Sequence, residues 1–257
     1  MTGTTRGIGK TILPGLLEQQ LKLVLVSRDM DRMKAIREEL GASDVQMQLY
    51  ECDLSIPAEV DDTANRIKQS GLKLDAILHN AAIDPRHRFD EEDDALWKDV
   101  WQVNLGSAVA ITRHLLPLLR ASDQGRVIFT GSVMSELGGA YLTAYAASKA
   151  GLAGLTRSLA HELSDTNITV NCIVPGAIQV EREQPRTGSA GQSRLIDWQS
   201  VRRRLTPSDL LGPVCLLLSQ AGGGISAQTI TIDGGLIHPL AAIESQQRHL
   251  GPMDLER

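Results

Sequence analysis

The sequence predicts an α/β protein built on a parallel sheet with helices on both faces. Short, uninterrupted apolar runs alternate along the chain with longer stretches whose apolar residues recur at helical spacing. No linker, repeat or low-complexity tract divides the 257 residues, and an α/β chain of this length commonly forms a single domain. We therefore expect one doubly wound domain with right-handed crossovers, whose ligands bind beyond the carboxyl ends of the strands.

Each expected element follows from this pattern. Apolar runs bounded by turn residues predict strands at residues 23–26, 46–50, 76–78, 127–129, 168–174 and 229–232. Helical spacing predicts helices at residues 10–20, 31–40, 58–69, 97–119 and 144–163. Pro117 is expected to interrupt the fourth of these helices near its end, because proline lacks an N–H group.

Composition excludes several classes of protein. Hydrophobic residues make up 42% and charged residues 22% of the chain, which excludes a disordered, collagen-like or coiled-coil protein. The formal net charge of -5 indicates no basic surface for nucleic acid. Pro213 and three consecutive glycines break the longest uncharged run, residues 210–232, so we expect no membrane span. Three widely spaced cysteines without a CxxC pair predict neither a disulfide framework nor a metal site, and favour a reducing, cytoplasmic compartment.

A glycine-rich segment opens the sequence. Residues 2–9 read Thr-Gly-Thr-Thr-Arg-Gly-Ile-Gly and lead directly into the first expected helix. Such glycines let the backbone approach a pyrophosphate, while the start of the helix offers unpaired N–H groups. The spacing G-x-x-x-G-x-G is a variant of a dinucleotide-binding motif, although similar turns also occur without a ligand. No strand precedes the turn, so either the amino terminus lies further upstream or the chain fills the central position of the sheet in another way.

Two arginines bear on the choice of cofactor. Arg28 follows the strand expected at residues 23–26, where the adenosine ribose of a dinucleotide would lie, and Arg6 projects from the glycine-rich segment toward the same place. A guanidinium binds phosphate bidentately, so this pair favours the 2′-phosphate of NADP(H). Asp29 keeps NAD(H) as the competing cofactor, and either arginine could instead be a solvated surface residue.

A serine, a tyrosine and a lysine form a candidate catalytic group. Ser132 follows the strand expected at residues 127–129, and Tyr145 and Lys149 lie four residues apart, which places them on one face of a helix. A neighbouring cation lowers the pKa of a phenol and suits it to proton transfer near neutral pH. Taken alone, a Tyr–Lys pair on a helix surface would be the simpler interpretation.

Together with several shorter motifs, this group resembles the classical short-chain dehydrogenase/reductase family. The matching residues run in the same order from residue 2 to about residue 236: Thr2-Gly3, Gly7-Ile8-Gly9, Asp53-Leu54, Asn80-Ala81-Ala82, Asn104, Ser132, Tyr145, Lys149, Pro175-Gly176 and Ile232-Asp233-Gly234-Gly235. The resemblance implies a Rossmann-type fold and an NAD(P)-dependent oxidoreductase that interconverts a carbonyl and a secondary alcohol by hydride transfer.

The resemblance also implies roles for the matching residues. Tyr145 would be the general acid/base, Lys149 would lower its pKa, and Ser132 would bind the substrate oxygen. Asn104 would hold a water that links the lysine to a proton relay. The expected cofactor contacts are Gly3, Thr5, Arg6, Gly7, Ile8, Arg28, Asp53, Leu54, Asn80, Ala81, Tyr145, Lys149, Pro175, Gly176 and Ile178, and no metal ligand is expected.

The sequence departs from the family's pattern at a few positions. The family usually has asparagine at the position of His79 and glycine at the position of Ala82. Thr4 replaces a frequent glycine, and Ala227 stands where a glycine is usual. None of these changes removes a catalytic group, and we interpret His79 as a hydrogen-bonded core histidine rather than a catalytic one.

These observations predict an NADP(H)-dependent carbonyl reductase or alcohol dehydrogenase. The alternatives are an NAD-dependent alcohol or sugar dehydrogenase, and a non-catalytic nucleotide-binding protein of the same fold. We expect residues 1–236 to form the cofactor-binding domain, with residues 178–206 as a substrate lid and residues 237–257 as a carboxyl-terminal extension. The substrate is expected to be a sugar, polyol or small oxo-compound, and the protein to be a homodimer or homotetramer.

Overall fold

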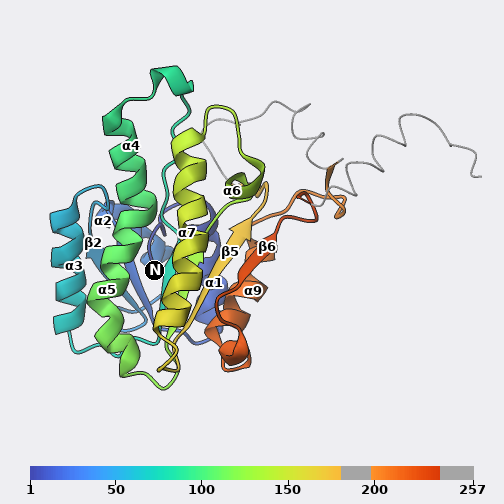
Figure 1. The fold of residues 1–257 in the computed structure, drawn as a ribbon. Coiled ribbons are helices and arrows are strands. Elements are labelled where there is room, and N and C mark those ends of the chain that lie inside the picture. The colour runs from blue at the N-terminus through green and yellow to red at the C-terminus, as the bar shows by residue number, and fades with distance from the viewer. Residues whose placement is uncertain (181–197, 238–257) are drawn as a thin grey trace, which may run out of the picture.

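A parallel sheet lies between two layers of helices (Figure 1). The computed structural model describes residues 1–180 and 198–237, so most of the expected lid and nearly all of the expected extension lie outside the described residues. The strands are β1 (Leu23–Ser27), β2 (Met47–Glu51), β3 (Ala76–His79), β4 (Arg126–Thr130), β5 (Thr169–Pro175) and β6 (Thr229–Ile232). All six expected strands are confirmed, to within one residue at either end.

Helices cover both faces of the sheet, each through its own apolar cluster. One face carries α3 (Pro57–Gln69), α4 (Asp94–Trp101), α5 (Ser107–Arg120) and α7 (Thr143–Glu162). The other carries α1 (Gly7–Glu18), α2 (Met30–Glu39) and α9 (Ser208–Leu218). On the first face Val60, Ile111 and Leu152 are buried in one cluster, and on the second Ile12 and Val214 are buried in another. The predicted fold class, a doubly wound α/β domain with covered faces, is confirmed.

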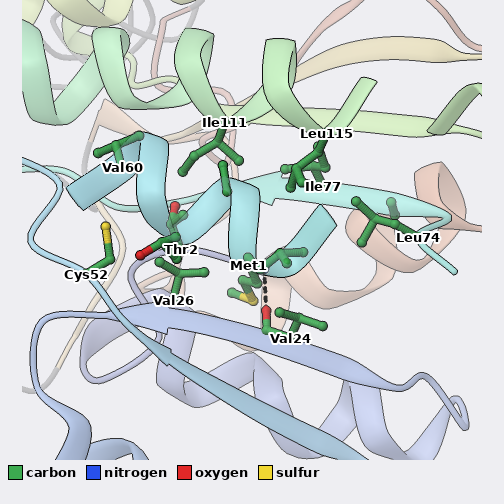
Figure 2. Close-up of a pocket in the computed structure, with 14 residues that line it drawn as sticks. Met1, Thr2, Val24, Val26, Cys52, Val60, Leu74, Ile77, Ile111 and Leu115 are labelled. Atoms are coloured by element: carbon green, nitrogen blue, oxygen red, sulfur yellow. Dashed lines mark hydrogen bonds between the residues drawn. The ribbon is translucent and has the colours of Figure 1, made fainter. Parts of the chain in front are cut away.

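Hydrogen bonding divides the strands into two blocks. All pairs are parallel, with β1 bonded to β2 in one block and the order β3-β4-β5-β6 in the other. Within residues 1–180 and 198–237, the main-chain hydrogen bonds that join the blocks are those of Met1 and Thr2. The nitrogen of Met1 donates to the carbonyl oxygen of Val24 (2.6 Å, dashed line in Figure 2), and the N–H of Val26 donates to that of Met1 (2.9 Å). Thr2 then donates its N–H to the carbonyl oxygen of Leu78 on β3 (3.1 Å), so Met1 and Thr2 fill the carboxyl-end part of the central position.

The helix expected at residues 97–119 differs from the observed structure. The structure instead has α4, a π-helical turn (Gln102–Gly106) and α5, which continues through Pro117 to Arg120. The interruption therefore lies at the π turn, and the expected break at Pro117 was wrong. Leu115 and Leu119 are buried on either side of Pro117, and this packing outweighs the loss of one N–H donor.

One helix was missed. The composition of residues 210–232 suggested a broken polar run, yet α9 forms with Gly212 and Pro213 inside it. Leu210, Val214 and Leu217 are buried at helical spacing, and this is the sequence signal that could have found the helix. In the described ranges no helix combines the length and apolarity that crossing a membrane requires.

Candidate functional site

Five of the predicted site residues follow the carboxyl ends of strands. Arg28 follows β1, Asp53 follows β2, Asn80 follows β3, Ser132 follows β4 and Gly176 follows β5. Since the strands are parallel, these ends share one edge of the sheet. The glycine-rich segment lies at the same edge, because Thr2 bonds both to β3 and to the residues that follow it.

Lys149 is a buried cation next to the tyrosine ring. Its side chain is 3% exposed, and its ammonium donates to the main-chain oxygen of Thr130 at the end of β4 (2.6 Å). The same Nζ lies 5.8 Å from the centre of the Tyr145 ring, one turn earlier on α7. Burial lowers the pKa of Lys149 to about 8, against a smaller opposing effect of Cys172. The ammonium therefore carries its charge at neutral pH within reach of the phenol.

Ser132 begins the loop that leads from β4 into the short helix α6 (Met134–Leu137). Its side chain is 9% exposed, and its hydroxyl oxygen accepts the N–H of Met134 (3.2 Å). Val133 donates its N–H to the carbonyl oxygen of Pro175 (3.1 Å), which ties this loop to the end of β5. The hydroxyl keeps its own proton to donate to a ligand.

Asn104 occupies the π turn between α4 and α5 and is 2% exposed. Its Oδ1 accepts the N–H of Ile83 (2.8 Å), and its Nδ2 donates to the carbonyl oxygen of Ile83 (2.9 Å) and to the hydroxyl of Ser148 (3.0 Å). Both amide hydrogens are therefore used within the protein. Asn104 joins the loop after β3 to α7, one residue from Lys149.

The glycine-rich segment forms a cradle in which Gly3 and Gly9 have no room for a side chain. Gly3 has φ +69°, and a Cβ atom there would lie 2.6 Å from the Cα of Ala81. A Cβ atom on Gly9 would lie 1.9 Å from the carbonyl oxygen of Gly3. Gly7 has φ +56° and starts α1, and the first N–H groups of a helix have no partner within the helix and can bind an anion. This geometry fits the pyrophosphate of a dinucleotide.

The residue after β3 holds this cradle in place. The side-chain Nδ2 of Asn80 donates to the carbonyl oxygen of Gly3 (2.8 Å). The hydroxyl oxygen of Thr2 accepts the main-chain N–H groups of Asn80 and Ala81 (3.1 Å each). The segment expected to run along the adenosine ribose is thus bonded directly to the segment expected to bind the phosphates.

Three arginines with exposed side chains bear on the choice of cofactor. Arg6 occupies the N-cap position of α1 without a side-chain capping bond, and Arg28 follows β1. Arg32, on the first turn of α2, donates its Nε to the carbonyl oxygen of Thr5 in the cradle (2.8 Å). The carboxylate of Asp29 accepts the N–H of Arg32 (2.9 Å) and so serves as the N-cap of α2.

Asp53 and Leu54 lie in the turn after β2. The pKa of Asp53 is lowered, mainly because its carboxylate accepts the main-chain N–H of Ser55. The nearby charge of Arg28 lowers this pKa further. Its carboxylate also accepts the hydroxyl of Ser55 (2.8 Å). Leu54 is buried, and its carbonyl oxygen accepts the side chain of Gln102 (3.2 Å).

The residues after β5 close the opposite side of the site. A Cβ atom on Gly176 would lie 2.6 Å from the Cα of Asp233, so this glycine permits a close backbone contact. Ile178 forms a parallel bridge with Leu205, next to the bond from the N–H of Gln179 to the carbonyl oxygen of Leu205 (2.7 Å). Residues 178 and 179 therefore pair with Leu205, near the end of the segment expected to be the lid.

Sequence analysis missed several of the residues that support this site. Thr130 and Ser148 bond to Lys149 and Asn104, and Arg32 bonds to the cradle. Of these three residues, only Arg32 could have been predicted from the sequence, because it follows Arg28 by four residues, about one helical turn. The interpretation of His79 as a core histidine is confirmed. It is buried, bonds to the hydroxyl of Thr112 (2.8 Å), and burial lowers its pKa to about 3.

The three cysteines are free thiols, and within residues 1–180 and 198–237 no three His, Cys, Asp or Glu side chains gather as a metal site would need.

Comparison with known proteins identifies the family. The family model described as short chain dehydrogenase matches residues 1–189. The 3-oxoacyl-[acyl-carrier-protein] reductase FabG of Escherichia coli (strain K12) is 30% identical over 237 residues, which cover 92% of this chain and 95% of that protein.

Solved structures agree with this assignment. A 4-hydroxyisoleucine dehydrogenase complexed with NADH matches with a TM-score of 0.84 at 25% identity, over 92% of this chain and 97% of that chain. A blue fluorescent protein from a metagenomic library, in complex with NADPH, matches with a TM-score of 0.82 at 26% identity, over 92% and 96% of the two chains. The chain therefore belongs to the short-chain dehydrogenase/reductase family and is an NAD(P)-dependent oxidoreductase.

Proposed function

We propose that this protein is an NADP(H)-dependent oxidoreductase that interconverts a carbonyl and a secondary alcohol, with Tyr145 as general acid/base. The observation that carries the proposal is the buried ammonium of Lys149, 5.8 Å from the ring of Tyr145 and fixed by the carbonyl oxygen of Thr130. A fixed cation favours the phenolate form of tyrosine, so the phenol can exchange a proton with a substrate oxygen near neutral pH.

In the direction of reduction, Tyr145 donates its phenolic proton to the substrate oxygen, and Lys149 stabilises the phenolate that remains. In oxidation the phenolate accepts the proton of the alcohol. Ser132 donates a hydrogen bond to the same oxygen and orients it, while its loop is held against β5 through Val133. A bound nicotinamide cofactor supplies or accepts the hydride at the substrate carbon.

Asn104 is proposed as a positioning residue for this proton transfer. It holds Ser148, the neighbour of Lys149, and both main-chain groups of Ile83. Both amide hydrogens of Asn104 are used inside the protein. A water of a proton relay would therefore donate a hydrogen bond to an oxygen of Asn104. The π turn keeps this polar residue facing α7.

The preference for NADP(H) over NAD(H) rests on the outer side of the cradle. Arg6, Arg28 and Arg32 present exposed guanidinium groups there, and Arg32 is anchored through its Nε to Thr5. The carboxylate of Asp29, the residue that favoured NAD(H), is engaged in capping α2. A 2′-phosphate would accept hydrogen bonds from these guanidinium groups, which bind phosphate bidentately.

The substrate is proposed to be a sugar, polyol or small oxo-compound. The loops that would shape its pocket, residues 84–88 and 134–142, are rich in polar and small side chains and meet through the N–H of His87 and the carbonyl oxygen of Tyr141 (3.3 Å).

The active form is proposed to be a homodimer or homotetramer in the cytoplasm. The outer surfaces of α4 and α5 expose Trp101 and Val109, beside the alanine-rich α7, and apolar side chains of this kind suit close helix packing. The free thiols suit a reducing compartment. A monomer in light scattering would contradict the oligomer.

The replacement Tyr145→Phe tests the mechanism. We expect it to lower kcat by about 10²- to 10⁴-fold, because it removes the transferable proton. NADPH affinity, followed by cofactor fluorescence, should change less than about threefold. Tyr50→Phe is the matched control, since Tyr50 lies on β2 beside Arg66, outside the proposed catalytic group, and should keep full activity. Turnover at the wild-type rate in the Tyr145→Phe protein would reject the assignment.

The replacement Arg28→Ala tests the cofactor preference. NADPH affinity should fall roughly tenfold or more while NADH affinity stays nearly constant, because only NADPH carries the 2′-phosphate. Lys34→Ala, which removes an exposed cation further along α2, is the control. Equal losses for both cofactors would reject the preference for NADP(H) and leave the oxidoreductase assignment intact.

A further inference from the structure

The loop between β3 and α4 starts beside the proposed catalytic residues. The main-chain N–H and carbonyl groups of Ile83 both bond to the side chain of Asn104 (2.8 and 2.9 Å). Asn104 in turn donates to the hydroxyl of Ser148 (3.0 Å), the residue that precedes Lys149 on α7. The start of this loop is therefore fixed, through one side chain, to the neighbour of the buried ammonium.

The same loop is held a second time, four residues further on. The N–H of His87 donates to the carbonyl oxygen of Tyr141 (3.3 Å), and Tyr141 precedes Tyr145 by four residues. Tyr141 has φ +66°, a conformation that residues with a Cβ atom rarely adopt and that is concentrated at active and binding sites. Figure 1 shows the loop at the same end of the molecule as the start of α7. Residues 84–86 therefore lie close to the turn of α7 that carries Tyr145.

Arg86 lies between these two points of attachment. A chain advances at most about 3.6 Å per residue, so the Cα atom of Arg86 is within roughly 11 Å of that of Ile83 and about 3.8 Å from that of His87. Its side chain is exposed. Among residues 1–180 and 198–237 its guanidinium forms neither an ion pair nor a hydrogen bond. A positive charge therefore stands without a counter-charge next to the proposed site.

The acidic run at residues 90–94 follows the loop, and four of its five carboxylates have other partners. The first two lie 3.1 and 3.9 Å from the Nε of Arg88. The third accepts the Nε1–H of Trp97 (2.9 Å), and the fourth accepts the N–H of Leu96 (2.8 Å) as the N-cap of α4. Of the two arginines in this loop, Arg88 is therefore neutralised and Arg86 is left for a ligand.

We propose that Arg86 binds a carboxylate of the substrate, so that the protein acts on hydroxy acids and the corresponding oxo acids. This inference rests on the proposed function, whose substrate class it narrows. A guanidinium binds a carboxylate through two parallel hydrogen bonds, which fix the orientation of the bound molecule as well as its position. Asp84 and Glu136, the acidic residues of the loops 84–88 and 134–142, add negative charge. A singly charged carboxylate is therefore favoured over a more highly charged phosphate.

The test compares two oxo acids of different length with their neutral amides: acetoacetate with acetoacetamide, and levulinate with levulinamide. The members of each pair have the same ketone and nearly the same shape, and they differ in charge. With NADPH, the wild-type protein should reduce the better acid with a kcat/KM about 10- to 100-fold above that of its amide. Raising the ionic strength should diminish this preference, because salt screens the charge of an exposed guanidinium.

Variants of Arg86 connect this preference to one side chain. Arg86→Gln should abolish the preference, chiefly by raising KM for the acid, because the contact acts on binding rather than on proton transfer. Arg86→Lys keeps the charge without the paired hydrogen bonds and should retain part of the preference. Arg66→Gln, which removes another exposed arginine, on α3, is the matched control and should behave as wild type. Titration calorimetry of the NADPH-loaded proteins with the two acids measures binding without turnover.

The outcomes separate the carboxylate site from the proposed function. Equal kcat/KM values for acid and amide in wild type, or a preference that survives Arg86→Gln, would overturn the carboxylate site and leave the oxidoreductase assignment intact. Reduction of neutral ketones alone would have the same meaning. Binding of the acids that depends on Arg86, without oxidation of NADPH by any carbonyl compound, would support the site and contradict the proposed function. Neither binding nor reduction of any of these compounds would overturn both.

Discussion

The two hydrogen-bonded blocks of the sheet hold the site in different ways. In the block β3-β4-β5-β6, each strand is bonded to its neighbour along most of its length. Lys149 and Ser132 attach to this block through Thr130, Val133 and Pro175. The block β1-β2 is followed by Arg28 and Asp53, and in the part of the chain that the structure describes it is joined to the rest of the sheet through the main chain of Met1 and Thr2 alone.

The difference indicates which part of the site is built rigidly. Proton transfer needs groups fixed within a fraction of an ångström, and the proposed catalytic residues lie on the continuous block. The side proposed to hold the adenosine of the cofactor needs only to bind it, and it depends on a few bonds around Thr2. Substitutions in the first block should therefore act mainly on turnover, and those in the second mainly on cofactor affinity and stability.

The largest effect is expected for Lys149→Met. Removing the only cation seen against the Tyr145 ring in the described structure should lower kcat/KM by about 10²- to 10⁴-fold. Steady-state rates with NADPH and a panel of carbonyl substrates give the measurement. Lys98→Met, an exposed lysine of α4, should leave the rates unchanged. A loss below about tenfold would remove Lys149 from the proposed mechanism.

The same variant carries a pH signature. The folded protein releases the Lys149 proton at about pH 8, whereas the unfolded chain keeps it to the ordinary pKa of 10.5. Between these two pH values the unfolded state binds more protons than the folded state. The free energy of unfolding therefore increases with pH, by at most about 1.4 kcal/mol per pH unit. Wild type should therefore gain stability relative to Lys149→Met from pH 8 to 10. A constant difference in denaturant unfolding would contradict the burial of a protonated lysine.

Asn104→Ala should destabilise the continuous block by about 2–4 kcal/mol. The change leaves both main-chain groups of Ile83 and the hydroxyl of Ser148 without their partner in a buried place. Gln102→Ala is the control, because Gln102 donates one longer bond from a half-buried side chain and should cost about 1 kcal/mol. If urea unfolding shows similar losses of unfolding free energy for Asn104→Ala and Gln102→Ala, the bonds of Asn104 stabilise the protein no more than the single bond of Gln102.

Thr2→Val should affect the junction of the two blocks. It keeps the shape of the side chain but removes the acceptor for the N–H groups of Asn80 and Ala81, at about 1–3 kcal/mol. The Kd for NADPH should rise several-fold, while kcat at saturating NADPH stays nearly constant. Thr11→Val, an exposed change on α1, should alter neither value. A fall in kcat with unchanged Kd would contradict the expectation that the junction of the two blocks affects cofactor affinity rather than turnover.

The smallest effect is expected for Ala227→Gly, in the turn before β6. Ala227 has φ +60°, a conformation that costs a residue with a Cβ about 1–2 kcal/mol. Glycine relieves this strain but loses more conformational entropy on folding. The free energy of unfolding should therefore rise by up to about 1 kcal/mol. Ala110→Gly, within α5, should instead lose about 1 kcal/mol. Destabilisation by Ala227→Gly in thermal unfolding would mean that the turn does not strain alanine.

Local patterns in the sequence carried much of this description. The six strands were predictable because buried parallel strands are continuous apolar runs, and their carboxyl ends located Ser132, Asn80 and Gly176. The helical spacing of Tyr145 and Lys149 was equally local. The π turn at Asn104 and the helix α9 were not predicted, because packing against distant elements outweighed the local effects of proline and glycine.

The sequence by itself determined the fold class, the family resemblance and the identities of the candidate catalytic residues, since these depend on residue type and spacing. Only the tertiary structure decided how those residues are held. The partners of Lys149, Asn104 and Arg32 lie 19, 21 and 27 residues away along the chain, and such contacts leave no periodic signal. The role of Met1 and Thr2 as the junction of two blocks was decided in the same way, because hydrogen bonds between strands depend on which segments the folded chain brings together.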